Sequence, residues 1–118
     1  MKHVLYAEDD FTNRKLVKHF LQKHNIECEL VSNGVDAFKY AKDKNYQLII
    51  LDQYMPGMNG IDIVKKLRQD GNNIPAIAIT SDDSLIEELK HAGFNEVFIK
   101  PLHQTVYNEI VKTYLTEK

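Results

Sequence analysis

The segment LIILDQYMPGMNG, residues 48–60, joins an apolar run to an acidic residue and a turn. Leu48 to Leu51 are apolar, Asp52 follows directly, and a Met-Pro-Gly turn leads to Asn59-Gly60, where a helical pattern begins. A continuous apolar run is typical of a strand that is covered on both faces of a parallel sheet. A charge at the end of such a strand is unfavourable unless a partner compensates it. The role of Asp52 therefore depends on the side chains that the fold brings next to it.

Similar apolar runs recur along the chain and alternate with segments of helical spacing. Strands are predicted at residues 3–7, 27–32, 48–51, 76–80 and 96–100, and helices at 11–24, 35–44, 61–71, 81–93 and 103–115. Right-handed crossovers between five consecutive β-α units favour an α/β fold with an open, doubly wound parallel sheet. In such a fold the functional groups gather outside the carboxyl ends of the strands.

The spacing inside the helical segments indicates which side chains face the sheet. Apolar residues fall on one face of the first helix and recur every three residues in the second. The predicted inward-facing residues are Leu16, Val17, Phe20 and Leu21, then Val35, Phe38 and Ala41, and in the last helix Val106, Ile110 and Leu115 or Tyr114. Glycines 71 and 93 are predicted to end the third and fourth helices.

Composition and charge bound the kind of protein. The 118 residues, 43% hydrophobic and 27% charged, suit one globular domain over residues 1–118. The formal net charge of -2 gives no basis for wrapping nucleic acid. No stretch approaches the ~20 apolar residues of a membrane span, and the first residues do not read as a signal peptide. The single cysteine, Cys28, cannot form an internal disulfide. We therefore expect a cytoplasmic domain without direct nucleic-acid or membrane contact.

Polar residues stand at the ends of four predicted strands. They are Glu8-Asp9-Asp10 after the first strand, Asp52 after the third, Thr80-Ser81 after the fourth and Lys100-Pro101 after the fifth. Each has an ordinary structural explanation when taken alone; Asp10, for example, is placed to cap the helix that begins near Phe11. If the first and third strands are neighbours, however, their carboxylates converge. The coincidence at four strand ends favours a functional site.

The residue types in this cluster suit phosphoryl chemistry. Carboxylates that lie together raise each other's pKa unless a cation neutralises them, and an all-oxygen set suits Mg²⁺ rather than zinc. Asp52 is placed to attack phosphorus and form an acyl phosphate. Lys100 is placed to balance charge on the phosphoryl group, and Thr80 to donate a hydrogen bond to it. The five histidines (His3, His19, His24, His91 and His103) have no ligand spacing, so helical or solvated roles are expected for them.

In order and spacing these residues closely resemble the response regulator receiver domain of two-component signalling, in the CheY-like superfamily, over essentially the whole chain. The segments that carry the resemblance are YAEDDFTNR, LIILDQYMPGMNG, AIAITS and FIKP. The resemblance implies a flavodoxin-like (βα)5 three-layer sandwich with a five-stranded parallel sheet in the order 2-1-3-4-5. It also implies a cis peptide bond between Lys100 and Pro101.

The resemblance further implies a role for each site residue. Asp52 would be the phosphoacceptor, Thr80 the switch hydroxyl and Lys100 the phosphate-binding cation. A Mg²⁺ or Mn²⁺ ion would be held by Asp9 directly, Glu8 through water, Asp52 and the backbone carbonyl of Tyr54. Tyr54 and Asp82 would flank the approach of water to the acyl phosphate, so that the bulky Tyr54 is expected to slow hydrolysis.

Three positions depart from the commonest pattern of the family. Glu8 stands where aspartate is more frequent, and its extra methylene still allows a contact through water. Ser81 replaces alanine or glycine after Thr80 and is also small. Val97 stands where a tyrosine or phenylalanine usually turns inward as the switch hydroxyl moves, and the adjacent Phe98 points to the opposite face of the strand. Val97 therefore puts the usual threonine-aromatic coupling in question and leaves the site chemistry intact.

The implied function is a phosphorylation-driven switch and not an enzyme with turnover. A sensor histidine kinase or a histidine phosphotransfer domain would donate a phosphoryl group to Asp52, and the domain would take part in its own phosphorylation and dephosphorylation. The surface of the fourth helix, fifth strand and fifth helix would then change its affinity for a downstream effector, either separate or fused to the chain. The domain would be a monomer, with dimerisation on phosphorylation left open.

Three other functions are compatible with parts of the sequence. A phosphorylation-independent partner-binding module, a pseudo-receiver, is kept open by Val97 but opposed by the intact Asp9, Asp52, Thr80 and Lys100. An aspartate-nucleophile phosphohydrolase is opposed by Tyr54, which stands where such enzymes carry a second acid, and by the absence of a cap domain. A flavin binder is opposed by the acidic loop after the first strand.

Overall fold

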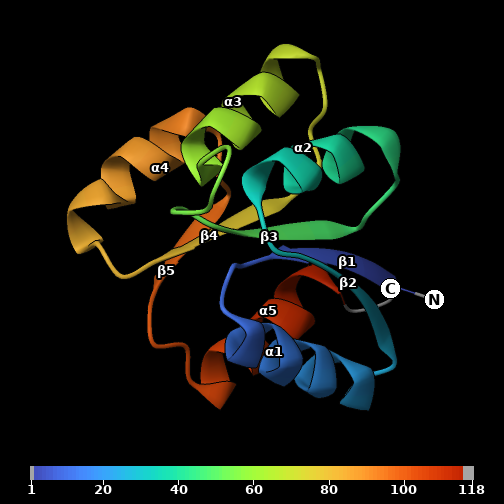
Figure 1. Cartoon of the computed structure of the whole chain (residues 1–118). Coiled ribbons are helices and arrows are strands. Elements are labelled where there is room, and N and C mark those ends of the chain that lie inside the picture. The colour runs from blue at the N-terminus through green and yellow to red at the C-terminus, as the bar shows by residue number, and fades with distance from the viewer. Residues whose placement is uncertain (1, 116–118) are drawn as a thin grey trace.

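A computed structural model describes residues 2–115 and contains five strands that alternate with five α-helices (Figure 1). The strands are β1 (Lys2–Ala7), β2 (Ile26–Val31), β3 (Leu48–Asp52), β4 (Ala76–Thr80) and β5 (Glu96–Ile99). The helices are α1 (Phe11–Lys23), α2 (Gly34–Asp43), α3 (Gly60–Gln69), α4 (Ile86–Ala92) and α5 (Gln104–Tyr114). All neighbouring strands pair in parallel, in the order β2-β1-β3-β4-β5. The predicted fold class and strand order are confirmed.

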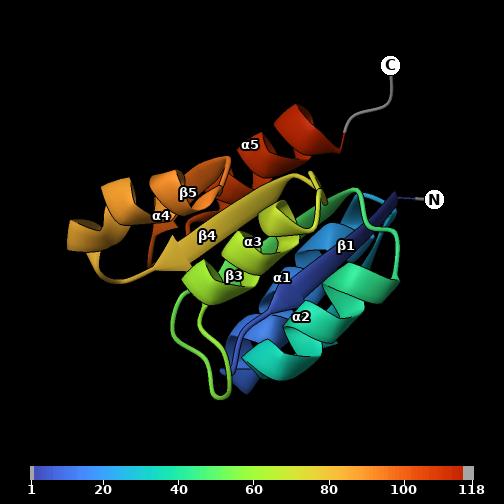
Figure 2. The ribbon, with the colours of Figure 1, turned by 90° about the horizontal axis from the view of Figure 1, so that it is seen from above.

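The sheet is covered on both faces, which explains the continuous apolar runs of its central strands. Helices α2, α3 and α4 lie on one face and α1 and α5 on the other (Figures 1 and 2). Every residue of β3 and of β4 is buried. Because successive side chains of a strand point to opposite faces, Ile49 packs under α2–α4 and Ile50 under α1 and α5. The sheet therefore separates two apolar clusters.

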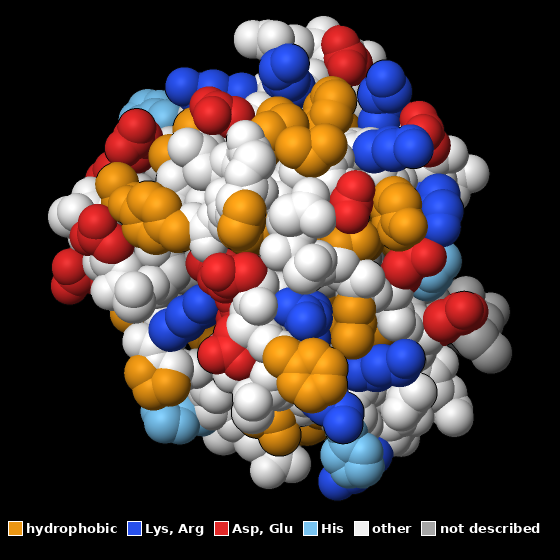
Figure 3. Space-filling model, in the orientation of Figure 1, with side chains coloured by type: hydrophobic (Ala, Val, Ile, Leu, Met, Phe, Trp, Pro, Cys, Tyr) orange, Lys and Arg blue, Asp and Glu red, His pale blue; other side chains and the backbone are white. Residues whose placement is uncertain are grey.

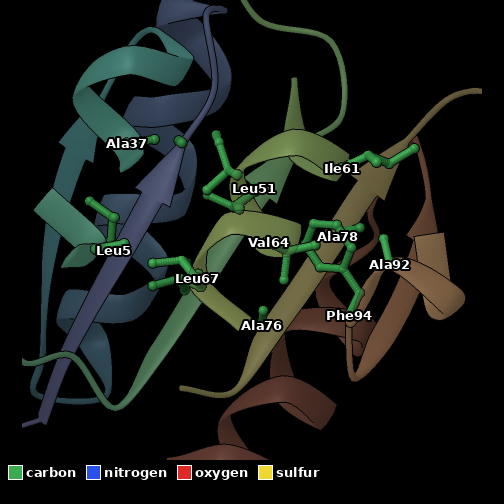
Figure 4. Close-up of a cluster of buried hydrophobic side chains, with 14 of the residues drawn as sticks. Leu5, Ala37, Leu51, Ile61, Val64, Leu67, Ala76, Ala78, Ala92 and Phe94 are labelled. Atoms are coloured by element: carbon green, nitrogen blue, oxygen red, sulfur yellow. The ribbon is translucent and has the colours of Figure 1, made fainter. Parts of the chain in front are cut away.

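The cluster beneath α2, α3 and α4 combines small and large side chains (Figure 4). Ala37 and Ala41 let α2 approach the sheet closely, while Leu67 of α3 and Phe94 fill the space between the layers. Burying a leucine- or phenylalanine-sized side chain contributes roughly 1.5–3 kcal/mol. The other face is closed by Val17 and Leu21 of α1 together with residues of α5.

Helices α1, α2 and α3 each begin after a residue whose side chain caps the first turn. The side chain of Asp10 accepts a hydrogen bond of 3.0 Å from the backbone N–H of Asn13, so its expected capping role is confirmed. Asn33 and Asn59 cap α2 and α3 in the same way, at 2.8 and 2.9 Å. Each cap satisfies one of the amides that the first turn of a helix leaves without a partner. Gly71 follows the last residues of α3 at a φ of 80°, in the left-handed region that glycine adopts without strain.

The predicted helix over residues 81–93 is interrupted. The side chain of Asp82 accepts a hydrogen bond from the Ser84 N–H, and the chain then makes a 3-10 turn, Asp83–Leu85, before α4 begins at Ile86. A side-chain cap at this position draws the backbone into a tight turn, which delays the α-helix.

Two predicted inward-facing residues are exposed. Leu16 is 61% exposed and Val35 is 54% exposed, whereas Val17, Ala37 and Ala41 are buried. The sheet covers only a narrow stripe of each helix. When residues 17 and 21 of α1, or 37 and 41 of α2, lie in this stripe, Leu16 and Val35 fall outside it. The predictions for Val17, Leu21 and Ala41 are confirmed, and those for Leu16 and Val35 are wrong.

The part of the chain that the structure describes contains no helix long and apolar enough to cross a membrane. On the face drawn in Figure 3, hydrophobic, acidic and basic side chains are interspersed, and no large area carries one charge alone. This mixed surface agrees with the small net charge of -2 and gives no footprint for a polyanion on this face.

Candidate functional site

Parallel pairing of β1 with β3 brings the predicted carboxylates together. Ala7 lies opposite Leu51 in the sheet, so Glu8 and Asp52 emerge side by side at the same edge. One carboxylate oxygen from each of Glu8, Asp9 and Asp52 lies within 4.8 Å of the others. Glu8 is 1% exposed and Asp52 5% exposed, while Asp9 is exposed. Two buried carboxylates and one open one therefore share a small volume.

Lys100 is the cation in contact with this cluster. Its Nζ donates to Asp52 Oδ2 at 2.7 Å and lies 3.1 Å from Glu8 Oε1. Burial lowers the pKa of Lys100, but the hydrogen bonds and charges of Asp52 and Glu8 outweigh that effect and raise it. Burial, followed by the hydrogen bond with Asp52 and its charge, raises the pKa of Glu8 to about 7. The single ammonium therefore does not fully compensate the carboxylates.

The first turn of α1 holds Glu8 in place. Asn13 Nδ2 donates to Glu8 Oε1 at 3.1 Å, and Arg14 Nη1 donates to the Glu8 backbone carbonyl at 2.8 Å. These positioning contacts were not predicted. Their signal in the sequence is the Asn13-Arg14 pair one turn after the acids, but spacing alone does not show that both side chains fold back toward β1.

The ends of β4 and β5 are joined at the other side of the cluster. Thr80 is fully buried, and its Oγ1 accepts a hydrogen bond of 3.1 Å from the Asp82 N–H. Lys100 N–H donates to the Thr80 carbonyl at 2.8 Å, which fixes the start of the Lys100-Pro101 segment. The Lys100-Pro101 peptide bond is cis, as the resemblance implied. Asp82 Oδ1 is engaged with both the N–H and the Oγ of Ser84, at 3.0 and 2.5 Å.

Val97 and Phe98 lie on opposite faces of β5, as expected from strand geometry. Val97 packs against the cluster under α2, α3 and α4, and Phe98 packs against the cluster under α1 and α5. The position three residues before Lys100 therefore holds Val97 and no aromatic ring, and the aromatic side chain of Phe98 lies on the other face of the sheet. The valine leaves a smaller side chain at that position.

The loop between β3 and α3 forms the remaining wall of the site. It lines a cavity of about 530 Å³ together with Asp9, and Tyr54 is 56% exposed at its edge. Gln53 is buried, and its Oε1 accepts a hydrogen bond of 3.0 Å from the Ile61 N–H. Gly34 of α2 donates from its N–H to the Pro56 carbonyl at 2.8 Å. Gln53 and Gly34 therefore position the loop, a role that their sequence positions did not reveal.

The donor set of the cluster fits a hard divalent cation. Three carboxylates supply oxygen ligands only, which suits Mg²⁺ or Mn²⁺ and is a poor match for zinc. Among the described residues no other group of three acids, histidines or cysteines meets the same distance limit. A bound divalent cation would also compensate the carboxylate charge that Lys100 does not neutralise.

A family model of the response regulator receiver domain matches residues 4–112. The chain is 34% identical, over 97% of its length, to the osmosensing histidine protein kinase SLN1 of Saccharomyces cerevisiae, and 30% identical, over 90% of its length, to the autoinducer 2 sensor kinase/phosphatase LuxQ of Vibrio parahaemolyticus. The chain spans only 10% and 13% of those two proteins.

Solved structures give the same result for the fold. The response regulator protein TrrA from Thermotoga maritima, in complex with Mg(2+)-BeF, has a TM-score of 0.87 at 29% identity and matches over 97% of this chain and 99% of that one. A two-component response regulator from Clostridium difficile has a TM-score of 0.88 at 26% identity, over 98% of this chain and 96% of that one.

Proposed function

The chain belongs to the response regulator receiver domain family, and from this membership and the geometry of the acidic cluster we propose that Asp52 accepts a phosphoryl group from a phosphohistidine. The observation that carries the proposal is the convergence of Glu8, Asp9 and Asp52 within 4.8 Å, with Lys100 bonded to Asp52 at 2.7 Å. The donor is a sensor histidine kinase or a histidine phosphotransfer domain, in keeping with the kinase relatives.

In the proposed step, a carboxylate oxygen of Asp52 attacks phosphorus while the phosphorus–nitrogen bond to the donor imidazole breaks. The nitrogen keeps the electron pair and takes up a proton, and Asp52 becomes an acyl phosphate. Lys100 moves from pairing with the free carboxylate to pairing with the phosphoryl oxygens, where an ammonium offsets the added charge. Thr80 supplies a hydroxyl that donates a hydrogen bond to one of these oxygens.

A Mg²⁺ or Mn²⁺ ion would be held by Asp9 and Asp52, by Glu8 through water and by the Tyr54 carbonyl. A bound ion would supply positive charge that lowers the repulsion between the Asp52 carboxylate and the phosphoryl oxygens. Asn13 and Arg14 contribute by keeping Glu8 at the edge of this set.

The output of the switch is a changed surface on α4, β5 and α5, read by a downstream effector in trans or in the same polypeptide. In the structure the Asp82 N–H donates a hydrogen bond to Thr80 Oγ1, and this bond is released when Thr80 turns toward the phosphoryl group. Because Asp82 caps the turn that precedes α4, the release is transmitted to α4. Transmission from Thr80 through Asp82 to α4 does not require an aromatic residue at position 97, which is a valine in this chain.

The lifetime of the acyl phosphate depends on the exposed ring of Tyr54. We expect Tyr54→Ala to dephosphorylate several-fold faster than the parent, because the ring shields the acyl phosphate from water. Dephosphorylation is followed by intact mass after the donor is removed. An unchanged dephosphorylation rate would refute the shielding role of Tyr54. Tyr40→Phe on α2, prepared and measured in the same way, controls for differences in sample preparation.

The decisive experiment is the intact mass after incubation with acetyl phosphate, with and without Mg²⁺, beside Asp52→Asn. A Mg²⁺-dependent gain of one phosphoryl group that is absent in Asp52→Asn supports the proposal. No gain under any condition, with a folded protein by circular dichroism, would overturn it. A gain that persists in Asp52→Asn would place the acceptor elsewhere.

A further inference from the structure

The loop between β3 and α3 starts at Gln53 and returns to the same residue. The Gln53 carbonyl accepts a hydrogen bond of 2.9 Å from the N–H of Gly60, the first residue of α3. The side chain binds the next residue of that turn, since Gln53 Oε1 accepts a hydrogen bond of 3.0 Å from the Ile61 N–H. The Gln53 N–H in turn donates to the Ile79 carbonyl of β4 at 3.0 Å. Residue 53 therefore ties the first turn of α3 to two strands of the sheet.

Gln53 is a buried polar residue in the company of the site residues. The described residues include four buried polar or charged side chains, and the other three are Glu8, Asp52 and Thr80. Burying a carboxamide is unfavourable unless it forms hydrogen bonds. The first N–H groups of a helix have no partner inside the helix, so the Ile61 N–H needs an acceptor from outside α3. The Gln53 carboxamide meets that need, and in doing so it holds the start of α3 against the end of β3.

The close approach of α3 to Gln53 depends on the glycine at position 60. A Cβ on Gly60 would lie 3.1 Å from Gln53 Oε1, 3.2 Å from the Asp52 carbonyl oxygen and 3.3 Å from Gln53 Cα. These separations are tighter than nine in ten Cβ contacts in proteins. The missing side chain of Gly60 thus leaves the room that the Gln53 carboxamide occupies.

The carbonyl of the residue after Gln53 belongs to the proposed metal set. Tyr54 lies between two fixed points of the loop, Gln53 on one side and Pro56 on the other, where the Pro56 carbonyl accepts a hydrogen bond of 2.8 Å from the Gly34 N–H. The Tyr54 ring is exposed, so packing of the side chain contributes little to holding the backbone. The position of the Tyr54 carbonyl is therefore set mainly by the two fixed points.

We propose that Gln53 is a positioning residue for the divalent cation, because its hydrogen bond to the Ile61 N–H keeps the Tyr54 carbonyl at the edge of the acidic cluster. The inference rests on the proposed function, from which it takes Asp9, Asp52 and Tyr54 as the direct protein ligands. Gln53 is not among the described residues that line the cavity beside Asp9, so its side chain acts on the ion only through the loop.

The test is a titration of the ¹⁵N-labelled full chain with MgCl₂, without a phosphoryl donor, followed by the amide shifts of the β1–α1 and β3–α3 loops. Gln53→Met nearly keeps the volume of the side chain but removes the acceptor of the Ile61 N–H. Removing a group that orients a metal ligand typically weakens metal binding 10–100-fold, and we expect a loss of about tenfold for this variant. An unchanged Mg²⁺ dissociation constant would overturn the proposal.

A conservative variant and a matched control separate positioning from a general loss of structure. Gln53→Glu keeps an oxygen acceptor for the Ile61 N–H, at a helix N-terminus that favours an anion, and should bind Mg²⁺ at least as tightly as the parent. Asn72→Ala removes the acceptor of another backbone N–H, that of Ile74 at 3.0 Å, at the far end of α3, and should leave Mg²⁺ binding unchanged. Equal weakening in Asn72→Ala and Gln53→Met, or binding by Gln53→Glu as weak as that of Gln53→Met, would overturn the positioning role. All titrations are made where circular dichroism shows each variant to be folded, because a lower global stability then leaves the dissociation constant unchanged.

The result for Gln53 is distinguishable from that for the proposed function. Labelling of the parent at Asp52 by acetyl phosphate decides whether the chain accepts a phosphoryl group, and the Mg²⁺ titrations contain no donor. A parent that is labelled, together with parent-like Mg²⁺ binding in Gln53→Met, would overturn the role of Gln53 alone. A parent without saturable Mg²⁺-dependent shifts would overturn both that role and the proposed metal set.

Discussion

Replacing Gly34 with alanine should lower the free energy of unfolding by about 3 kcal/mol, because α2 and the β3–α3 loop touch at this residue. A Cβ on Gly34 would lie 1.8 Å from the carbonyl oxygen of Met58 and 2.6 Å from its carbonyl carbon. Real Cβ atoms essentially never come within 3.0 Å of another atom in this way, so the two backbones must separate by more than 1 Å. The move also weakens the 2.8 Å hydrogen bond from Gly34 N–H to Pro56.

The magnitude follows from these two losses. Overpacking a rigid contact costs about 1–3 kcal/mol, and losing a backbone hydrogen bond costs about 1 kcal/mol. With a urea m value of about 1.5 kcal/mol/M, a loss of about 3 kcal/mol lowers the unfolding midpoint by about 2 M. Urea unfolding followed by circular dichroism measures this shift.

Gly71→Ala is the matched control. Gly71 has a φ of 80°, and a Cβ there would meet no atom within 4 Å, so alanine suffers only the left-handed backbone conformation. We expect a loss of about 1–2 kcal/mol for this variant. A midpoint for Gly34→Ala that falls no further than that of Gly71→Ala would refute the steric argument. Since the displaced loop carries Tyr54, slower labelling by acetyl phosphate is expected in Gly34→Ala as well.

Three further predictions concern other parts of the fold. Burial raises the pKa of the Cys28 thiol to about 12. At pH 8 the thiol should therefore react slowly with a disulfide reagent in the native protein and fast in urea. Equal reaction rates in the native and the urea-unfolded protein would contradict the burial of Cys28. The hydrogen bond from the Tyr46 hydroxyl lowers the pKa of Glu29. The stability that this hydrogen bond gives the folded protein is therefore complete above the ordinary carboxyl pKa, and it is lost as the pH falls through the lowered pKa of Glu29. Tyr46→Phe should therefore lose about 1 kcal/mol at neutral pH, with a smaller loss in acid unfolding curves near about pH 3. Arg68 Nε and Nη2 donate hydrogen bonds to the Gly93 carbonyl at 3.1 and 3.0 Å. Arg68→Met should therefore lower the free energy of unfolding, measured in urea, by about 1–3 kcal/mol. A free energy within about 0.5 kcal/mol of the parent would show that these hydrogen bonds are dispensable.

Prediction from sequence succeeded where a local pattern carries the information. The apolar runs identified all five strands, and Asp10 was correctly expected to cap α1. It failed where one side chain overrides the pattern. Asp82 turns the start of the fourth helix into a 3-10 turn, and the sheet buries Val17 while leaving Leu16 exposed. Such outcomes depend on which neighbour the segment meets, and periodicity along one segment contains no record of that neighbour.

The alternation of strands and helices, and the acidic, hydroxyl and cationic residues at the strand ends, can be read from the sequence, because residue type and short-range spacing carry both. The hydrogen bond from Lys100 to Asp52 joins residues 48 positions apart, and the contact of Gly34 with the loop after β3 also joins distant segments, so both appear only in the folded chain. A cavity lined by Tyr6 of β1 and by residues of α1 and α5 likewise exists only in the folded chain. Distances between segments are set by how closely the layers pack, and close packing is a property of the whole molecule.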